Sequence, residues 1–280
     1  MRPTIISCFW ISVLMTVVPA HAGKGRLLAT GGVTNIEGSG GGGITPWASL
    51  SSYAEADEWG ATLTYSAAGV DDFGLRVQGV SVTYGNRVEV SYARQQFDLD
   101  TIGGELEQDI WGAKVRLTGD LIYGDIPQIS LGVQHKKNRT FALPQAVGAR
   151  SDKGTDYYLS AGKAWLHGPF ARTWLANITL RATKANQTGL LGFGGDKGNS
   201  HELMAEAAVA MFVNRYWVIG TEYRQKPDNL GFAGEHDWHD VFVAWFPNKT
   251  MGVVGAYTNL KSIAGLPDQK GWYLSLQVTF

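Results

Sequence analysis

Apolar and polar residues alternate one by one along most of this chain. In the last ten residues, every second position is apolar: Trp272, Leu274, Leu276, Val278 and Phe280. Successive side chains of a β-strand point to opposite faces, so this segment predicts a strand with one apolar and one polar face. Eleven further segments show a similar alternation, and the chain is therefore expected to be all-β.

The predicted strands cover residues 58–67, 73–84, 88–98, 108–118, 127–137, 156–165, 174–184, 200–212, 217–225, 237–246, 250–260 and 271–280. The tight connections between them are 85–87, 213–216 and 247–249, and the long ones are 99–107, 138–155, 185–199, 226–236 and 261–270. Bacterial outer-membrane barrels have short periplasmic turns and longer outer loops, and a periplasmic C-terminus puts all five long connections on the outer side. The pattern predicts a transmembrane antiparallel up-and-down β-barrel of about twelve strands over residues 58–280. Two stacked sheets of a soluble sandwich are the alternative.

Charged residues within the strands indicate which face points to lipid. Lys114 and Arg116 alternate with Trp111, Ala113 and Val115, and a Lys or Arg at the bilayer midplane costs about 2 to 4 kcal/mol. The charged side chains are therefore expected in the lumen. The same reasoning predicts ten pore-lining residues: Arg76, Glu89, Lys114, Arg116, Lys136, Arg181, Glu202, Glu206, Glu222 and Arg224.

Two local features refine this picture. The alternation in strand 73–84 loses phase near Gly79, where a β-bulge is expected. Aromatic residues gather near strand ends, as in the interfacial girdles of membrane barrels. In the closing strand, the residues expected to signal to the barrel assembly machinery are Tyr273, Leu276, Val278 and Phe280.

The first 22 residues have the organisation of a secretory signal peptide. Arg2 precedes an apolar stretch from residue 5 to 18, and Ala20 and Ala22 frame a small-x-small cleavage site. Cleavage after Ala22 would remove Cys8, the only cysteine, which excludes a disulfide framework and a cysteine nucleophile in the mature chain. We therefore expect export to the outer membrane of a Gram-negative bacterium.

Residues 23–57 form a Gly-rich N-terminal segment with a different character. They are expected either to enter the lumen as a plug or to add a hairpin, with strands at 26–36 and 44–53, that would raise the total to fourteen. Gly38, Gly40 and Gly43 fit a Gly-x-Gly-x-x-Gly pattern, but Pro46 follows where a nucleotide-binding motif needs a helix. We therefore expect a backbone role for these glycines and no bound cofactor.

The remaining candidate chemistry is weak. His236 and His239 lie in an acidic cluster at residues 235–240, but they point to opposite faces of an extended strand, so we expect no metal site there. No histidine lies in a recognisable hydrolase motif, although barrel enzymes assemble such sites from separate strands. The chain has 24 basic and 25 acidic residues, and this balance does not indicate a nucleic-acid partner.

Several segments resemble a known family. These are residues 27–33, 40–47, 184–189 (Lys-Ala-Asn-Gln-Thr-Gly), 226–231 (Lys-Pro-Asp-Asn-Leu-Gly) and 273–278 (Tyr-Leu-Ser-Leu-Gln-Val). In them the chain resembles a proteobacterial outer-membrane β-barrel family of unknown function, domain of unknown function 3034. The resemblance extends over essentially the whole mature chain. It implies an exported outer-membrane protein and transfers no catalytic residues.

The expected function is a narrow porin-like channel for small hydrophilic solutes or ions, whose luminal charges set its selectivity. The expected partners are outer-membrane lipid, the barrel assembly machinery and the transported solutes. Two alternatives remain open at this point. One is a barrel with an enzymatic or ligand-binding site at its outer loops, and the other is a plugged barrel with a structural role.

Overall fold

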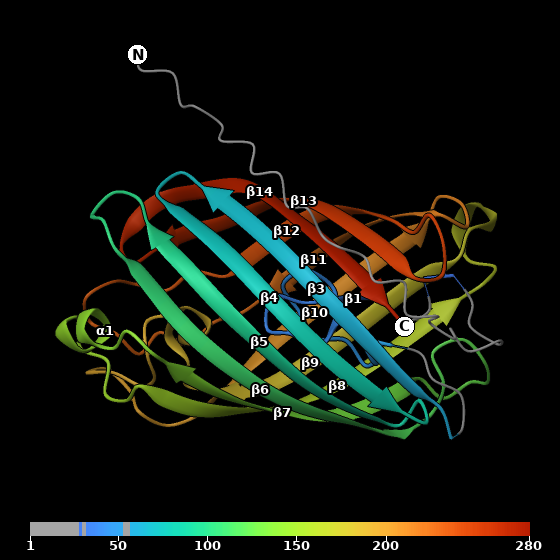
Figure 1. Cartoon of the computed structure of the whole chain (residues 1–280), viewed down its shortest axis with the longest axis horizontal. Helices are drawn as coiled ribbons and strands as arrows, with labels where there is room; N and C mark the ends of the chain where they lie inside the picture. The colour runs from blue at the N-terminus through green and yellow to red at the C-terminus, as the bar shows by residue number, and fades with distance from the viewer. Residues whose placement is uncertain (1–27, 30–31, 53–56) are drawn as a thin grey trace, which may run out of the picture.

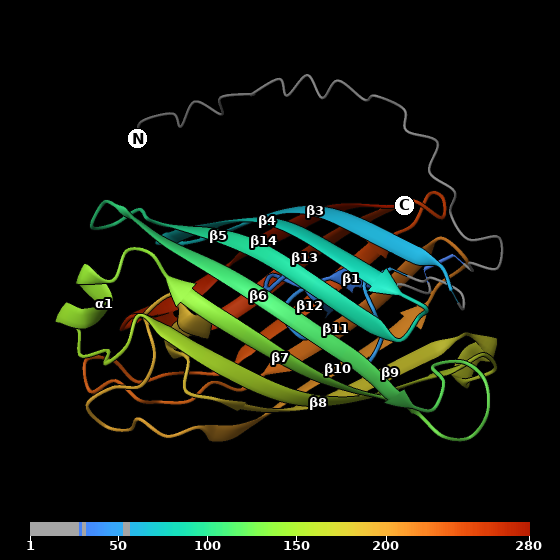
Figure 2. The ribbon, with the colours of Figure 1, turned by 60° about the horizontal axis from the view of Figure 1, so that its bottom comes forward.

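The computed structural model describes residues 28–29, 32–52 and 57–280, and the expected signal peptide lies outside these ranges. Twelve antiparallel strands close into one barrel, in which each strand pairs with its neighbours in the chain and β14 pairs with β3 (Figures 1 and 2). The barrel strands are β3 (Trp59–Val70), β4 (Phe73–Tyr84), β5 (Val88–Leu99), β6 (Glu105–Thr118), β7 (Gln128–Asn138), β8 (Lys153–Trp165), β9 (Trp174–Thr183), β10 (Glu202–Phe212), β11 (Trp217–Arg224), β12 (Trp238–Trp245), β13 (Met251–Ile263) and β14 (Leu266–Thr279).

The prediction of a twelve-strand barrel is confirmed, and each predicted strand corresponds to one strand of the structure. The fourteen-strand alternative is wrong. Two short strands, β1 (Val33–Thr34) and β2 (Gly40–Gly41), do form in the N-terminal segment, but they pair only with each other. Figure 1 shows this segment, in blue, inside the barrel and not in its wall.

Side-chain alternation determines the two surfaces of the barrel wall. Along β7, Gln128, Ser130, Gln134 and Lys136 are buried in the interior, whereas Leu131 between them is 49% exposed on the outside. The outward row of the closing strand is apolar from Trp272 to Phe280. An apolar exterior and a polar interior are what a strand needs when one face meets hydrocarbon and the other meets a lumen.

Connections are short at one end of the barrel and longer at the other. The C-terminus lies at the short-turn end, here called the turn end, and α1 (Ala142–Ala146) lies at the opposite loop end (Figure 1). Two further short helices are η1 (Pro169–Ala171) and η2 (Asn186–Gly189). Among the described residues, no helix is both long and apolar enough to cross a membrane.

Two local expectations are wrong. No bulge occurs near Gly79, where β4 stays in unbroken register with both neighbours. The long connection expected at 261–270 is a two-residue turn, because β13 and β14 continue to Ile263 and from Leu266. Polar residues there suggested a loop, but they belong to a hairpin whose register shifts after Asn259.

Candidate functional site: a segment that fills the lumen

Residues 32–52, here called the luminal segment, enter the barrel and occupy its interior. Every residue from Val33 to Ser52 is buried. The segment turns back on itself through the β1–β2 pair, so that both of its ends lie near the turn end (Figure 2). A lumen that would otherwise hold water is thereby filled by the protein's own chain.

Small residues let this segment lie close to the wall. A Cβ atom on Gly42 would stand 1.9 Å from the Glu222 carboxylate, and one on Gly38 would stand 2.8 Å from Ala93 Cβ. Gly38 also has a φ of +86°, which favours glycine. The Asn35 side chain accepts hydrogen bonds from the backbone N–H groups of Glu37 and Ser39, at 3.0 and 3.1 Å. These features give the segment a defined shape inside the barrel.

The centre of the site is the carboxylate of Glu37, which three cations from different strands surround. It receives Lys136 Nζ at 2.5 Å, Arg224 at 2.8 Å and Arg181 at 2.9 Å. Asp156 and Glu206 hold the same cations from the other side, since Asp156 lies 2.7 Å from Lys136 Nζ and Glu206 lies 2.6 Å from Arg181 Nε. Three positive and three negative side chains therefore form one buried, balanced cluster, here called the Glu37 cluster.

These cations also determine how Glu37 titrates. Burial by itself raises the pKa of the Glu37 carboxyl, but the charges of Arg181, Arg224 and Lys136 outweigh it and hold the pKa well below its ordinary value. Glu37 is thus an anion at neutral pH. Its ion pairs hold the luminal segment against three strands of the wall.

Acid should loosen this attachment only at low pH. A carboxyl whose pKa is lowered in the folded state contributes stability that is fully present above its ordinary pKa, about 4.3, and is lost as the pH falls through the lower folded value. Asp156 and Glu206 face the same cations, and Tyr158 lies under Arg181 at 5.3 Å. We expect bilayer conductance to stay minimal from pH 7 to about 4.5 and to rise only below that range. A rise between pH 7 and 5 would contradict this assignment.

A second attachment joins the luminal segment to β5 and β6. Glu89 accepts hydrogen bonds from the backbone N–H groups of Gly40 at 3.1 Å and Ser51 at 2.6 Å. Lys114 Nζ donates to the carbonyls of Gly40 at 2.6 Å and Ser49 at 2.9 Å, and lies 3.6 Å from Glu89. Both side chains are at most 1% exposed. One ion pair therefore satisfies backbone groups on both arms of the segment.

A third attachment is the carboxylate of Glu222. It accepts hydrogen bonds from the N–H groups of Gly43 at 2.6 Å and Ile44 at 2.9 Å, from the Thr45 hydroxyl, and from Trp47 Nε1 at 3.1 Å. Backbone N–H groups that converge on one carboxylate form a strong charge-assisted contact. The turn at residues 43–47 is thus built around a side chain of the wall.

Neutral side chains hold the rest of the segment. Ala48 is bound through both of its backbone groups, because its N–H donates to Asn177 Oδ1 at 2.8 Å and its carbonyl accepts from Ser130 Oγ at 2.6 Å. Gln277 accepts from the Thr34 N–H at 3.0 Å and donates to the Gly32 carbonyl at 2.9 Å. Backbone groups that leave water for the lumen therefore find partners on the wall.

A loop packs against wall residues that lie beside the luminal segment. Residues 185–193 between β9 and β10 are buried, and Asn138 Nδ2 donates to the Leu190 carbonyl at 2.6 Å. Lys136, which binds Glu37, also donates to the Thr188 carbonyl at 3.1 Å. One lysine therefore links the luminal segment to the loop.

The ten predicted pore-lining residues fall into three groups. The residues that bind the luminal segment or complete the Glu37 cluster are Glu89, Lys114, Lys136, Arg181, Glu206, Glu222 and Arg224. Arg116 and Glu202 share the inward rows but lie near strand ends, where Arg116 pairs with Asp120 and Glu202 is exposed. Arg76 does not face the interior. It lies outside, paired with Asp98 and Glu105, because Phe73 and Val77 take the inward positions of β4.

The other residues singled out from the sequence lie apart from this site. In the closing strand, Leu276, Val278 and Phe280 face outward, whereas the Tyr273 ring points inward and donates to Ser66 Oγ at 3.2 Å. His236 binds Ser262 Oγ at 2.7 Å, and His239 packs against Tyr223 with ring centroids 5.0 Å apart. Within the described ranges, no three His, Cys, Asp or Glu side chains form a group that could hold a metal ion.

Sequence reasoning missed the residue at the centre of the site. Glu37 lies in a Gly-rich stretch without strand periodicity, so the alternation of apolar and polar residues could not predict where its side chain points. A signal was present nevertheless, since Lys136, Arg181 and Arg224 were all expected in the lumen and buried cations need partners. Asp156 was missed because it is the first residue of the predicted strand 156–165 and no charged residue lies two positions away from it.

Comparisons with known proteins agree with this architecture. The structure of KdgM porin matches with a TM-score of 0.52 at 10% identity, and the match covers 78% of this chain and 99% of that chain. KdgM porin in complex with disordered oligogalacturonate matches with a TM-score of 0.50 at 9% identity and the same coverage. At these identities the likeness shows the fold alone.

The sequence comparisons are more specific. No curated protein sequence matches this chain significantly. The family model described as "Protein of unknown function (DUF3034)" matches residues 30–277 and so spans the luminal segment as well as nearly the whole barrel. The resemblance inferred from the sequence is thereby confirmed, and the chain belongs to the DUF3034 family.

Proposed function

We propose that this protein is an outer-membrane channel for small hydrophilic solutes or ions whose resting state is closed by the luminal segment. The observation that carries the proposal is the chemistry of the attachment. Charged and polar side chains of the wall hold the segment, and the same side chains would line an aqueous path if it left. Apolar packing adds to this attachment, because Val33, Ile36, Ile44 and Trp47 belong to one buried cluster with wall residues such as Ile110 and Phe242.

The barrel exterior supports the membrane location. Outward side chains such as Leu131, Ile178 and Val241 are 49 to 64% exposed on the outer surface of the barrel. Burying so broad an apolar surface in lipid removes it from water. In this proposal the turn end faces the periplasm, the loop end faces outward, and the barrel assembly machinery inserts the chain after export.

The proposal is tested by replacing residues 32–52 with a Gly-Ser linker of equal length. Purified wild-type protein in a planar bilayer should show minimal conductance, and the linker variant should show stable open-channel steps. Migration of the unheated protein in gel electrophoresis checks that the variant still forms a barrel. Deletion of residues 186–192 from the loop is the matched control and should leave the channel closed, because the luminal segment remains.

A linker variant that folds but shows no conductance would count against closure by the luminal segment alone. If the combined linker and loop variant were also silent, while still folded, the channel proposal would be wrong. That result would favour the plugged structural barrel.

A further inference from the structure

The polarity of the barrel wall inverts at the loop end of three adjacent strands. In β4, β5 and β6 the inward residues there are apolar, such as Phe73, Phe97 and Leu106. The outward residues beside them are polar: Arg76, Gln96, Asp98, Glu105 and Glu107. This is the reverse of the arrangement along β7. A channel mouth that only admitted water and ions would have no need of an apolar inner wall.

The inverted wall borders a cavity of about 230 Å³ at the loop end. α1, loop-end connections and the ends of strands contribute to it, through side chains that include Leu99, Leu143, Val147, Leu191 and Leu266. Thr101 is the one polar residue among its twelve lining residues, and its hydroxyl already donates to Asp72 Oδ1 at 2.5 Å. Water in a cavity needs two to four polar partners, so this lining is poorly suited to hold it.

Two exposed apolar side chains stand at the rim of this cavity. Ile102 is 69% exposed and Phe232 is 55% exposed, and both lie on loop-end connections away from the strands. Large apolar side chains at loop tips cost free energy in water unless something covers them. Their position beside the opening indicates a surface that an apolar molecule would meet first.

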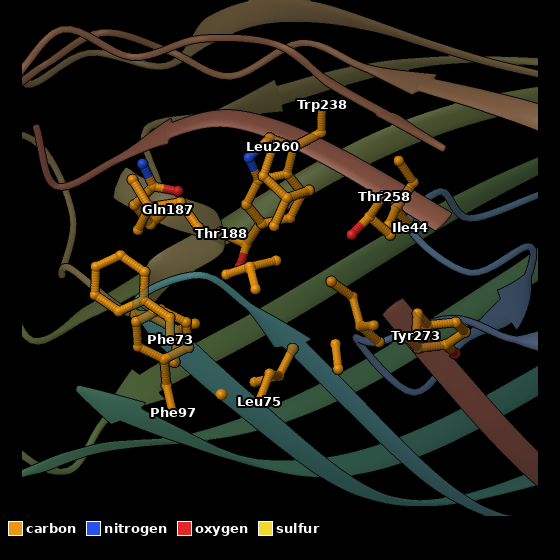
Figure 3. A pocket seen from close by; sticks show the side chains of 16 residues that line it. Ile44, Phe73, Leu75, Phe97, Gln187, Thr188, Trp238, Thr258, Leu260 and Tyr273 are labelled. Carbon is orange, nitrogen blue, oxygen red and sulfur yellow. The ribbon is translucent and has the colours of Figure 1, made fainter. Parts of the chain in front are cut away.

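A second, smaller cavity of about 50 Å³ continues inward from the first. Phe73, Phe97 and Ile263 line both cavities, and the rings of Phe73 and Phe97 stack with centroids 5.1 Å apart. Figure 3 shows these two rings at one side of the inner cavity. Tyr273 of β14 and Ile44 of the luminal segment lie at the other side. The two adjoining linings therefore place apolar side chains from the loop end to Ile44 of the luminal segment.

We propose that the outer cavity is a binding site for an uncharged hydrocarbon group, of the size of a single aromatic ring with a short alkyl substituent. A dry apolar cavity of about 150 Å³ binds benzene, so about 230 Å³ leaves room for a few more carbon atoms. The absence of any charged side chain among the lining residues excludes an ionic ligand. This site goes beyond the proposed channel, and its occupancy is measurable while the channel stays closed.

The test uses the full-length protein in amphipol with 4-fluorotoluene as the probe, followed by fluorine NMR. Wild-type protein should give a saturable bound signal of one molecule per barrel. Leu143→Trp fills the cavity from α1 and should weaken binding at least tenfold. Val147→Trp fills it from a neighbouring position and should do the same. Gln145→Trp adds the same ring to an exposed position of α1 outside the cavity and should bind like wild type.

Two sources of the hydrocarbon group are distinguished in the same experiment. Binding to the protein as purified indicates a free small molecule. Binding that appears only after delipidation, with one lipid retained beforehand in native mass spectrometry, indicates the acyl chain of a membrane lipid; either result supports the site. Equal binding by wild type and both cavity-filling variants, or none by delipidated wild type, would overturn it.

Discussion

Replacing Glu37 with glutamine is expected to release the luminal segment and convert a closed barrel into a conducting one. The substitution leaves Lys136, Arg181 and Arg224 facing only Asp156 and Glu206, so the cluster keeps one unbalanced positive charge. Breaking a buried ion pair by removing one partner typically costs about 3 to 5 kcal/mol. Because the segment can move away and let water reach the cations, we expect this free energy to favour release of the luminal segment from the wall over unfolding of the barrel.

The measurements are single-channel conductance and the accessibility of residue 39 to a thiol reagent in a Ser39→Cys background. Both should increase in Glu37→Gln, and the conductance rise in acid should be smaller than in wild type. Glu105→Gln removes a carboxylate from the exposed ion pair with Arg76 and is the matched control, expected to stay closed. If Glu37→Gln showed as little conductance and as little labelling of residue 39 as this control, the Glu37 cluster would have no role in closure.

Replacing Lys114 with methionine should produce the second large effect. The change removes the Nζ donor from the carbonyls of Gly40 and Ser49, of which Gly40 keeps the Trp47 N–H, and it leaves the Glu89 carboxylate buried without its cation. The expected loss is again about 3 to 5 kcal/mol, measured as a shift of the urea unfolding midpoint in detergent micelles. Lys137→Met, on the exposed outer side of β7, is the control and should change the midpoint little.

A double-mutant cycle separates the ion pair from the backbone contacts. Glu89→Gln in the Lys114→Met background removes the stranded charge, so the double variant should be less destabilised than the sum of the two single variants. Strict additivity of the two free-energy changes would mean that Glu89 and Lys114 act independently and do not form one coupled attachment.

The barrel could be predicted from the sequence because lipid imposes one simple rule on every strand. Side chains such as Leu131 and Val241 must face hydrocarbon, and their neighbours in the chain must face the lumen. Apolar and polar residues therefore alternate with a period of two. The rule fails where lipid no longer touches the wall. At the loop end of β4 the outward Arg76 and the inward Phe73 and Val77 reverse the pattern, so the sequence suggested a bulge near Gly79.

The luminal segment could be recognised as unusual but its contacts could not be predicted. Its shape depends on Gly38 and on the Asn35 side chain, and its attachments join residues 38 to 245 positions apart in the chain. Such pairs leave no local period. Most of the charged wall residues predicted from alternation nevertheless lie on the inward rows of their strands, because the face of each residue depends only on its own strand.

A reversible tether between the luminal segment and the wall shows whether this segment closes the barrel. A Cβ on Gly162 would lie 3.3 Å from Ala48 Cβ, close to the spacing of a disulfide, so Ala48→Cys and Gly162→Cys are introduced with Glu37→Gln. The only natural cysteine is Cys8, within the expected signal peptide. Conductance should be minimal under oxidising conditions and should appear in the same bilayer when a reductant is added. Conductance that is equal before and after reduction, with the disulfide shown to form, would contradict the account.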